Sequence, residues 1–393
     1  MYLKMVREAN PWWSYDKWED RDKNLADYNA LRIRWIPKWI NDVSLKPFSL
    51  NFVLGLRQVG KTTGLKLLIK KLVESVEPEN VVYIDCEVFP DFAALREAIV
   101  EYLEAVKFEE TKFLFLDEVT SLEEWWKAVK YLIDMGRLEN CVLTVTGSSS
   151  LKVRRDVEMF PGRTGYGSVV EVMPLNFQEF VRIHGVRNYK LEYDRVLELF
   201  KRYLKVGGFP LTINGYSSNH VLNALVGEFI RHGKSLEIAK ETFSSLISKI
   251  PSALSFRAVA QDTSGYSYKT VQEYLEFFRD LFILDFAYLK QGERIMYRRE
   301  RKVFFRDPLL LEVFSAWSNT SYLHSALIEG IVQEHLYRRY GRVFYYRNSY
   351  EIDCVVDELK VEVKAGKPHR RYPRGVTVLD EEDIPRFLIE LFA

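Results

Sequence analysis

The chain has 393 residues, which is enough for two or three domains at roughly 150 residues each. Hydrophobic residues make up 47% of it and the formal net charge is +1, so no overall field draws it to nucleic acid or membranes. Three scattered cysteines, Cys86, Cys141 and Cys354, argue against a disulfide framework or a zinc site and fit a reducing compartment. Without a secretory signal or an apolar run of ~18 residues, we expect a soluble cytoplasmic protein that does not bind membranes.

Residues 1–46 form an arm of mixed charge that is rich in tryptophan. Its tryptophans are Trp12, Trp13, Trp18, Trp35 and Trp39. We expect the arm to be ordered, because so many large aromatic side chains bury surface wherever they pack. Two interpretations are open: the arm straps over the core of the next domain, or it presents an aromatic wall to a nucleotide base.

Residues 47–173 alternate strand-like and helix-like segments. The predicted strands are "FSLNFVLG" at 48–55, "VVYIDCE" at 81–87, "KFLFLDE" at 112–118, "CVLTVTG" at 141–147 and "GSVVEVM" at 167–173. Short apolar runs separated by helices are typical of a parallel sheet covered on both faces. We therefore expect an α/β core here.

The segment "GLRQVGKTT" at 55–63 fits G-x-x-x-x-G-K-[ST], and it lies between a strand and a helix as this motif requires. Gly55 and Gly60 let the loop curl, so that backbone N–H groups and the helix N-terminus face a phosphate. We expect Lys61 to reach the β- and γ-phosphates of ATP and Thr62 to offer a hydroxyl to Mg²⁺. The other expected nucleotide-binding residues are Gln58, Val59 and Thr63.

Two adjacent carboxylates end the third predicted strand. Asp117 is expected to hold the Mg²⁺ shell together with Thr62. Glu118 and Lys61 are both expected to act in catalysis. Glu118 would orient or deprotonate the attacking water. The alternative is an acidic N-cap for the helix that follows.

Hydroxyls and arginines follow the fourth strand. The hydroxyl side chains, Thr144, Thr146, Ser148, Ser149 and Ser150, either sense the γ-phosphate or form a turn that caps the next helix. Three arginines come next, namely Arg154, Arg155 and Arg163. Arg163 is the catalytic candidate, because an arginine supplied in cis or in trans stabilises transition-state charge; a solvated surface role is the alternative.

Residues 174–239 are predicted to form a helical, lid-like region, interrupted by "GGFP" at 207–210. Residues 240–300 have three helical patterns and then a strand, which is the order of a winged helix. The third helix, within 269–282, has six apolar residues on one face. Its solvent face is expected to carry Glu273, Glu276 and Asp280 against Lys269 and Arg279, so a structural role and DNA binding are both open.

The segment "KQGERIMYRRERKVFFR" at 290–306 has seven Lys or Arg residues and two Glu. Arg298, Arg299, Arg301 and Lys302, with Tyr297, are candidates for a strip that contacts a DNA backbone. The alternative is an edge strand protected by its charge.

The stretch "YEIDCVVDELKVEVKAG" at 350–366 predicts a hairpin that turns at Asp357-Glu358. Alternation places Glu351 and Asp353 on one face of the first strand. It likewise places Glu362 and Lys364 on one face of the second strand. Two carboxylates can hold Mg²⁺ or Mn²⁺, which activates water, and Lys364 can stabilise the developing charge. Glu329 and Glu334, on an upstream helix, are further carboxylate candidates. The alternative is the polar face of an exposed hairpin.

The order of these motifs resembles AAA-type P-loop ATPases (AAA_14-like) that carry a winged helix and a DUF4143-type PD-(D/E)XK nuclease-like region, over nearly the whole chain. The resemblance implies Walker A at 55–62 and Walker B at Asp117-Glu118. It also implies a restriction-endonuclease-like α/β fold over residues 301–393. The residues that match its nuclease motif are Glu329, Asp353, Glu362 and Lys364.

We therefore expect a Mg²⁺-dependent ATPase that acts with DNA and has a C-terminal nuclease module, with Mg²⁺ or Mn²⁺ at the second site. One alternative is an ATP-driven switch whose nuclease-like domain binds DNA or protein without cleavage. Another is a signalling ATPase that binds protein and no nucleic acid. The sequence leaves open a protein partner and a homo-oligomer.

Overall fold

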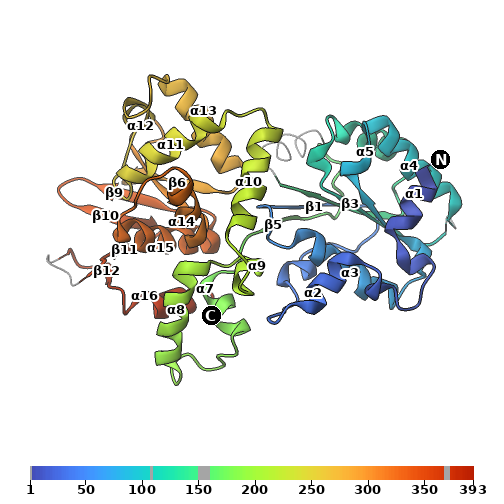
Figure 1. Ribbon diagram of the computed structural model, residues 1–393, viewed down its shortest axis with the longest axis horizontal. Helices are drawn as coiled ribbons and strands as arrows, with labels where there is room; N and C mark the ends of the chain where they lie inside the picture. The colour runs from blue at the N-terminus through green and yellow to red at the C-terminus, as the bar shows by residue number, and fades with distance from the viewer. Residues whose placement is uncertain (1, 107–108, 149–159, 367–371) are drawn as a thin grey trace. The chain divides into compact units, whose positions relative to one another are not determined.

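The computed structural model describes residues 2–106, 109–148, 160–366 and 372–393. Contacts divide the chain into two compact units, Met1–Val172 and Met173–Ala393 (Figure 1). We call them unit 1 and unit 2. In the described part of the chain, no helix combines the length and the apolar character needed to cross a membrane.

Unit 1 is built on a five-stranded sheet whose neighbours all pair in parallel, in the order β2-β3-β4-β1-β5. The strands are β1 Ser49–Gly55, β2 Val81–Asp85, β3 Lys112–Asp117, β4 Cys141–Gly147 and β5 Val169–Val172. The five predicted strands and their parallel arrangement are confirmed. Every residue of β1, β3 and β4 is buried, because helices cover both faces.

The helices of unit 1 are α1 Tyr2–Ala9, α2 Lys23–Ala30, α3 Lys61–Val73, α4 Phe92–Ala105 and α5 Trp125–Asp134. Short 3₁₀ turns lie at Pro11–Trp13, Trp18–Asp20, Lys38–Asn41, Pro78–Asn80, Cys86–Val88 and Val119–Ser121. Helices α2 and α3 lie on one face of the sheet, and α4 and α5 lie on the other (Figure 1).

The tryptophan-rich arm packs on the edge strand β2 and on α3. The indole N–H groups of Trp12 and Trp13 each donate to the carbonyl oxygen of Val81, both at 2.9 Å. Trp39 lies so close to α3 that a Cβ on Gly64 would come within 2.2 Å of its ring. These contacts are those of a strap over the core, the first of the two interpretations.

Unit 2 is mixed α/β. Its helices are α7 Phe177–Ile183, α8 Tyr193–Val206, α9 Pro210–Ile213, α10 Asn219–Arg231, α11 Leu236–Lys249, α12 Phe256–Gln261, α13 Tyr268–Asp280, α14 Pro308–Trp317, α15 His324–Tyr340 and α16 Ile384–Glu390. Its strands are β6 Leu284–Gln291, β7 Arg294–Ile295, β8 Arg301–Phe305, β9 Phe344–Arg347, β10 Glu351–Val356, β11 Leu359–Val363 and β12 Val376–Leu379.

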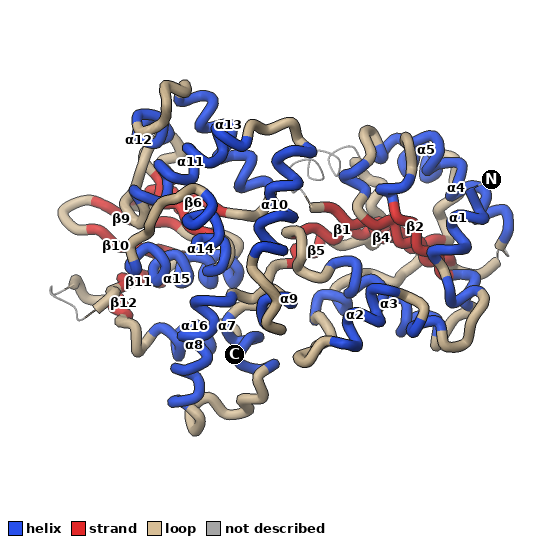
Figure 2. Tube along the Cα trace, in the orientation of Figure 1, coloured by secondary structure: helices blue, strands red, loops and turns tan. Residues whose placement is uncertain are grey.

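These strands form one sheet in the order β12-β11-β10-β9-β6-β7, with β8 also paired to β6. Strand β6 runs antiparallel to β7 and β8 and parallel to β9. The sheet therefore continues across residue 300, where the sequence predicts a domain boundary. Helix α15 packs against β8, β10 and β11 (Figure 2).

Helix α13 buries its predicted apolar face, but one residue predicted to face solvent is buried as well. All six predicted apolar residues, from Val271 to Phe282, are buried. The expectation that Asp280 faces solvent is wrong, since only 7% of it is exposed. It ends the helix where the chain, with a positive φ at Phe282, turns directly into β6.

The "GGFP" segment is joined to the start of α14 by one buried carboxylate. Asp307 accepts a hydrogen bond from the backbone N–H of Leu309 as the N-cap of α14, and another from Gly208, both at 2.9 Å. Gly207 has φ +63°, and a Cβ there would lie 2.0 Å from the Asp307 Oδ1 atom. Glycine is therefore required at this position, because its backbone has a positive φ and because there is no room for a Cβ atom.

We predict that Gly207→Ala lowers the free energy of unfolding of unit 2 by about 2–3 kcal/mol, from the strained φ together with the weakened Asp307 cap. Urea titration of the full chain, followed by hydrogen exchange of peptides from α8 and α14, measures this. Gly233→Ala is the matched control, because Gly233 has φ +64° but nothing within 4 Å of its Cβ position. An equal effect of both substitutions would show that the Asp307 contact contributes nothing.

Candidate functional site

The carboxyl edge of the parallel sheet gathers the predicted phosphate-site residues. The loop after β1 turns through positive φ at Gln58 and Gly60 and opens α3 at Lys61. The Lys61 ammonium donates to the carbonyl oxygens of Gly55 and Leu56, both at 2.8 Å, so it lies over the start of the loop. Gly55 has a further role, since a Cβ there would lie 1.9 Å from the carbonyl oxygen of Val172 in β5.

Asp117 is buried at the end of β3 and is held by three hydroxyl groups. Its Oδ2 atom accepts from Thr62 at 2.7 Å and from Tyr83 at 2.8 Å, and its Oδ1 atom accepts from Thr146. The structure thus brings Thr62 and Asp117 together across β4, as the sequence predicts. A hydroxyl and a carboxylate are oxygen donors of the kind Mg²⁺ prefers, so these residues fit a nucleotide-bound Mg²⁺.

Glu118 follows directly, with an unusual positive φ of 52°. Its backbone N–H donates to the Thr146 hydroxyl at 2.8 Å, and its carboxylate accepts from Thr120 at 2.6 Å and from Ser148 at 2.8 Å. Arg57 lies 3.7 Å from the same carboxylate oxygen. Thr146 and Ser148 therefore orient the two acidic residues. Ser149, Ser150, Arg154 and Arg155 lie outside the described residues.

Arg163 does not meet the other phosphate-site residues. It pairs with Asp134 at 2.7 Å and lies beside Ser49, the first residue of β1. The phosphate loop follows the last residue of that strand, so the seven residues of β1 place roughly 20 Å between the two ends. An action of Arg163 in cis on this chain's own γ-phosphate does not fit this placement.

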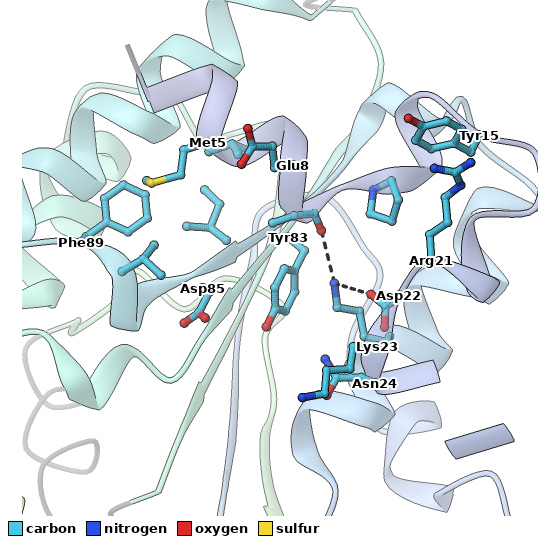
Figure 3. A pocket seen from close by; sticks show the side chains of 16 residues that line it. Met5, Glu8, Tyr15, Arg21, Asp22, Lys23, Asn24, Tyr83, Asp85 and Phe89 are labelled. Atoms are coloured by element: carbon cyan, nitrogen blue, oxygen red, sulfur yellow. Dashed lines mark hydrogen bonds and ion pairs between the residues drawn. The ribbon is translucent and has the colours of Figure 1, made fainter. Parts of the chain in front are cut away.

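A cavity of about 540 Å³ lies between the arm and β2 (Figure 3). Tyr83, Asp85 and Asp22 line it, together with Lys66, and none of residues 55–63 does. The Lys66 ammonium is 3.0 Å from Asp22 and 3.5 Å from the centre of the Tyr83 ring. Burial lowers the pKa of Lys66, while the Asp22 charge opposes that shift. Tyr83, which nothing in the sequence marks as functional, thus joins this cavity to Asp117.

The predicted hairpin of unit 2 is confirmed as β10 and β11, with Cys354 opposite Val361. Continuing that register places Asp353 opposite Glu362. The Asp353 Oδ2 atom accepts from the backbone N–H of Val363 at 2.9 Å. Burial and the nearby Asp353 charge raise the pKa of Glu362, and a hydrogen bond from Lys364 opposes that shift. The two predicted carboxylates are therefore neighbours.

Lys302, from β8, occupies the centre of the predicted carboxylate set. Its Nζ atom lies 2.8 Å from Glu329, 2.8 Å from Glu351 and 2.7 Å from Asp353. Burial by itself lowers the pKa of Lys302, but the three carboxylates outweigh it and raise that pKa well above its usual value. Burial raises the pKa of Glu329 to about 8, although the Lys302 charge opposes this.

Glu362 lies beside this cluster with partners of its own. Its Oε1 atom accepts from Lys364 and, at 2.9 Å, from Tyr372, whereas its buried Oε2 atom has no hydrogen-bond partner. Across residues 2–106, 109–148, 160–366 and 372–393, no three His, Cys, Asp or Glu side chains are arranged to hold a metal ion. The arrangement around Lys302 does not fit a divalent metal.

Two other expectations for unit 2 are corrected. Glu334 does not join the hairpin carboxylates, since it pairs with Arg306 and Arg338, each at 2.6 Å, five residues after Glu329 on α15. Lys302 is not part of an exposed basic strip, since 2% of it is exposed. Arg301 is half-buried over the ring of Phe256. Arg298 and Arg299 do remain exposed.

Mg²⁺ is expected to increase the affinity for ATP. We predict that Tyr83→Phe makes this increase roughly tenfold smaller, because one of the three hydrogen bonds that orient Asp117 is lost. Titration of a fluorescent ATP analogue with Mg²⁺ and with EDTA measures that gain. Tyr102→Phe removes a hydroxyl that donates to the carbonyl oxygen of Glu79, and it should change nothing. An unchanged gain in Tyr83→Phe would show that Tyr83 does not position Asp117.

Two curated relatives are uncharacterized proteins of Methanocaldococcus jannaschii, MJ1544 and MJ1637. Each is 26% identical, over 267 and 219 residues, or 62% and 49% of this chain. The matches cover 57% and 44% of the relatives, so the chain spans about half the length of the curated relatives it matches.

Two solved structures are also similar. The Walker-type ATPase PABY2304 of Pyrococcus abyssi is 14% identical with a TM-score of 0.44, over 76% of this chain and 95% of that one. The ORC1 protein of Aeropyrum pernix, solved with DNA, is 13% identical with a TM-score of 0.35, over 68% and 86%. Residues 48–181 match the family model of the AAA domain. The matched segment holds the phosphate loop and the paired acidic residues.

Proposed function

We propose that unit 1 binds and hydrolyses ATP with Mg²⁺. The observation that carries this proposal is the meeting of Thr62 with Asp117 at the carboxyl edge of the sheet, next to Lys61 and Glu118. Mg²⁺, when bound, would neutralise phosphate charge. Thr62 and Asp117 would hold it, and Lys61 would transfer its hydrogen bonds from the backbone to the phosphates.

Glu118 is the proposed base or orienting group for the attacking water. Thr120 and Ser148 both donate to one oxygen of its carboxylate, which fixes the side chain and leaves the other oxygen to accept a proton. Arg163 is proposed to act in trans, on the nucleotide of a neighbouring copy, because it lies at the opposite end of β1 from its own phosphate loop.

We predict that Lys61→Ala lowers ATP affinity by at least tenfold, because the loop loses its phosphate-binding cation. Glu118→Gln should retain ATP binding and lower the hydrolysis rate by roughly 10²–10⁴. Nucleotide titration and phosphate release measure the two effects. The matched controls are Lys71→Ala, exposed on the same helix, and Glu123→Gln, exposed after the same strand. Unchanged ATP binding in Lys61→Ala would refute the phosphate-loop assignment.

For unit 2 we propose an association with DNA that the nucleotide state of unit 1 controls. The support is the exposed middle of the basic segment, where Tyr297, Arg298 and Arg299 all face solvent. Helices α11 to α13 followed by β6 and β7 have the element order of a winged helix, which supports the same proposal. On α13, however, Arg279 lies over the Phe286 ring, so DNA contacts would come from the segment after β7.

The C-terminal sheet has two candidate roles, a metal-dependent nuclease and a platform that binds without cleavage. The Lys302 ammonium favours the platform, because it already pairs with Glu329 and Asp353, two of the carboxylates that a nuclease would use for metal. A signalling ATPase that binds only protein is the third candidate, and the exposed arginines speak against it.

We predict that Arg298→Ala/Arg299→Ala weakens DNA binding and reduces the slope of log affinity against log salt by about 1–2, since each phosphate contact contributes roughly 0.9. Fluorescence anisotropy with linear, single-stranded and branched DNA, with and without ATP, measures this. Arg187→Ala/Lys190→Ala is the control, because both side chains are exposed elsewhere in unit 2.

The same samples, incubated with Mg²⁺ or Mn²⁺, also decide the role of the C-terminal sheet. We expect the DNA to remain intact. Cleavage that disappears in Asp353→Ala would exclude the platform, and no DNA binding even at low salt would leave the protein-signalling candidate in front.

A further inference from the structure

The carboxylates of the C-terminal cluster come from two elements that are distant in the sequence. Glu329 lies on α15, and Glu351 and Asp353 lie on β10. Lys302 reaches them from β8, which pairs with β6 and is separated from β10 in the sheet by β9 and β6. Glu329, Asp353 and Lys302 are all buried, with at most 6% of each residue exposed. The cluster is thus buried apart from Glu351, which is partly exposed, and it carries its own cation.

The hydrogen-bonding capacity of this cation matches its surroundings. A lysine ammonium has three N–H donors and no acceptor. Glu329, Glu351 and Asp353 offer three acceptor oxygens at 2.7–2.8 Å from the Nζ atom. The ammonium donates hydrogen bonds to Glu329 and Asp353, and the Glu351 carboxylate completes its ion pairs.

The remaining groups of the cluster complete the same arrangement. Gln333 donates to Glu329 at 3.1 Å and to the carbonyl oxygen of Asp353 at 3.3 Å. The second oxygen of Asp353 accepts from the Val363 backbone. The Oε2 atom of Glu362 is the one buried carboxylate oxygen among them without a hydrogen bond. A single such oxygen does not make a metal site, because hard cations take several oxygen ligands.

We propose that the Lys302 ammonium is the resident cation of this cluster, in the place that a divalent metal would take in a nuclease. A divalent ion among the same oxygens would lie a few ångströms from the ammonium, where repulsion between like charges is strong in a buried site. The cluster therefore joins β8, β10 and α15 without metal.

Binding of Mn²⁺ to the nucleotide-free full chain tests the proposal, with free Mn²⁺ measured by electron paramagnetic resonance. The unaltered protein and Asp353→Asn should bind the same number of Mn²⁺ ions. Lys302→Met removes the charge at similar volume and should bind one more Mn²⁺ per chain. The double variant Lys302→Met/Asp353→Asn should lose that ion. Lys360→Met, exposed on the neighbouring strand β11, is the matched control and should gain none.

Two results would overturn the proposal. One is a Mn²⁺ ion bound by the unaltered protein and lost in Asp353→Asn, since it would show that metal displaces Lys302. The other is a folded Lys302→Met that gains no Mn²⁺. Should Lys302→Met fail to fold, the unaltered protein compared with Asp353→Asn and Glu362→Gln still decides. Equal Mn²⁺ binding in all three supports the proposal, and a loss in either variant overturns it.

Discussion

The proposed phosphate site depends on one buried carboxylate, Asp117, held at the carboxyl edge of a parallel sheet. A buried charge without hydrogen bonds is costly, and hydroxyls from three different elements offset that cost here. Thr62 comes from α3, Tyr83 from β2 and Thr146 from β4. Because β4 lies between β1 and β3, these contacts also fix the distance from the phosphate loop to the acidic residues.

The catalytic candidate Glu118 depends on the same edge. Its backbone N–H binds the Thr146 hydroxyl that also donates to Asp117, so one threonine positions both acidic residues. The arm is connected to this edge through Tyr83, whose ring faces Lys66 and whose hydroxyl reaches Asp117. A change in how the arm packs would therefore reach Asp117, the carboxylate proposed to hold Mg²⁺, through one side chain.

Unit 2 is organised by two buried ion clusters on α15. Glu329 faces Lys302, and Glu334 faces Arg306 and Arg338. Removing one partner from a buried pair costs about 3–5 kcal/mol, because the other charge is left uncompensated. The two clusters therefore tie α15 to Lys302 in β8 and to Arg306, the residue that follows β8. Glu329 and Glu334 are five residues apart, so they project from different sides of the helix and meet different partners.

The sequence by itself determined the elements and the local chemistry. Strands followed from apolar runs, the phosphate loop from glycine spacing and the hairpin from alternation, because each depends only on neighbours along the chain. What only the tertiary structure decided is which charges meet. Lys302 and Glu329 are 27 residues apart, and Lys302 and Asp353 are 51 apart, so no local pattern distinguishes an exposed basic residue from an internal cation. Arg163 likewise took its place at the far end of β1 because of how the sheet is assembled.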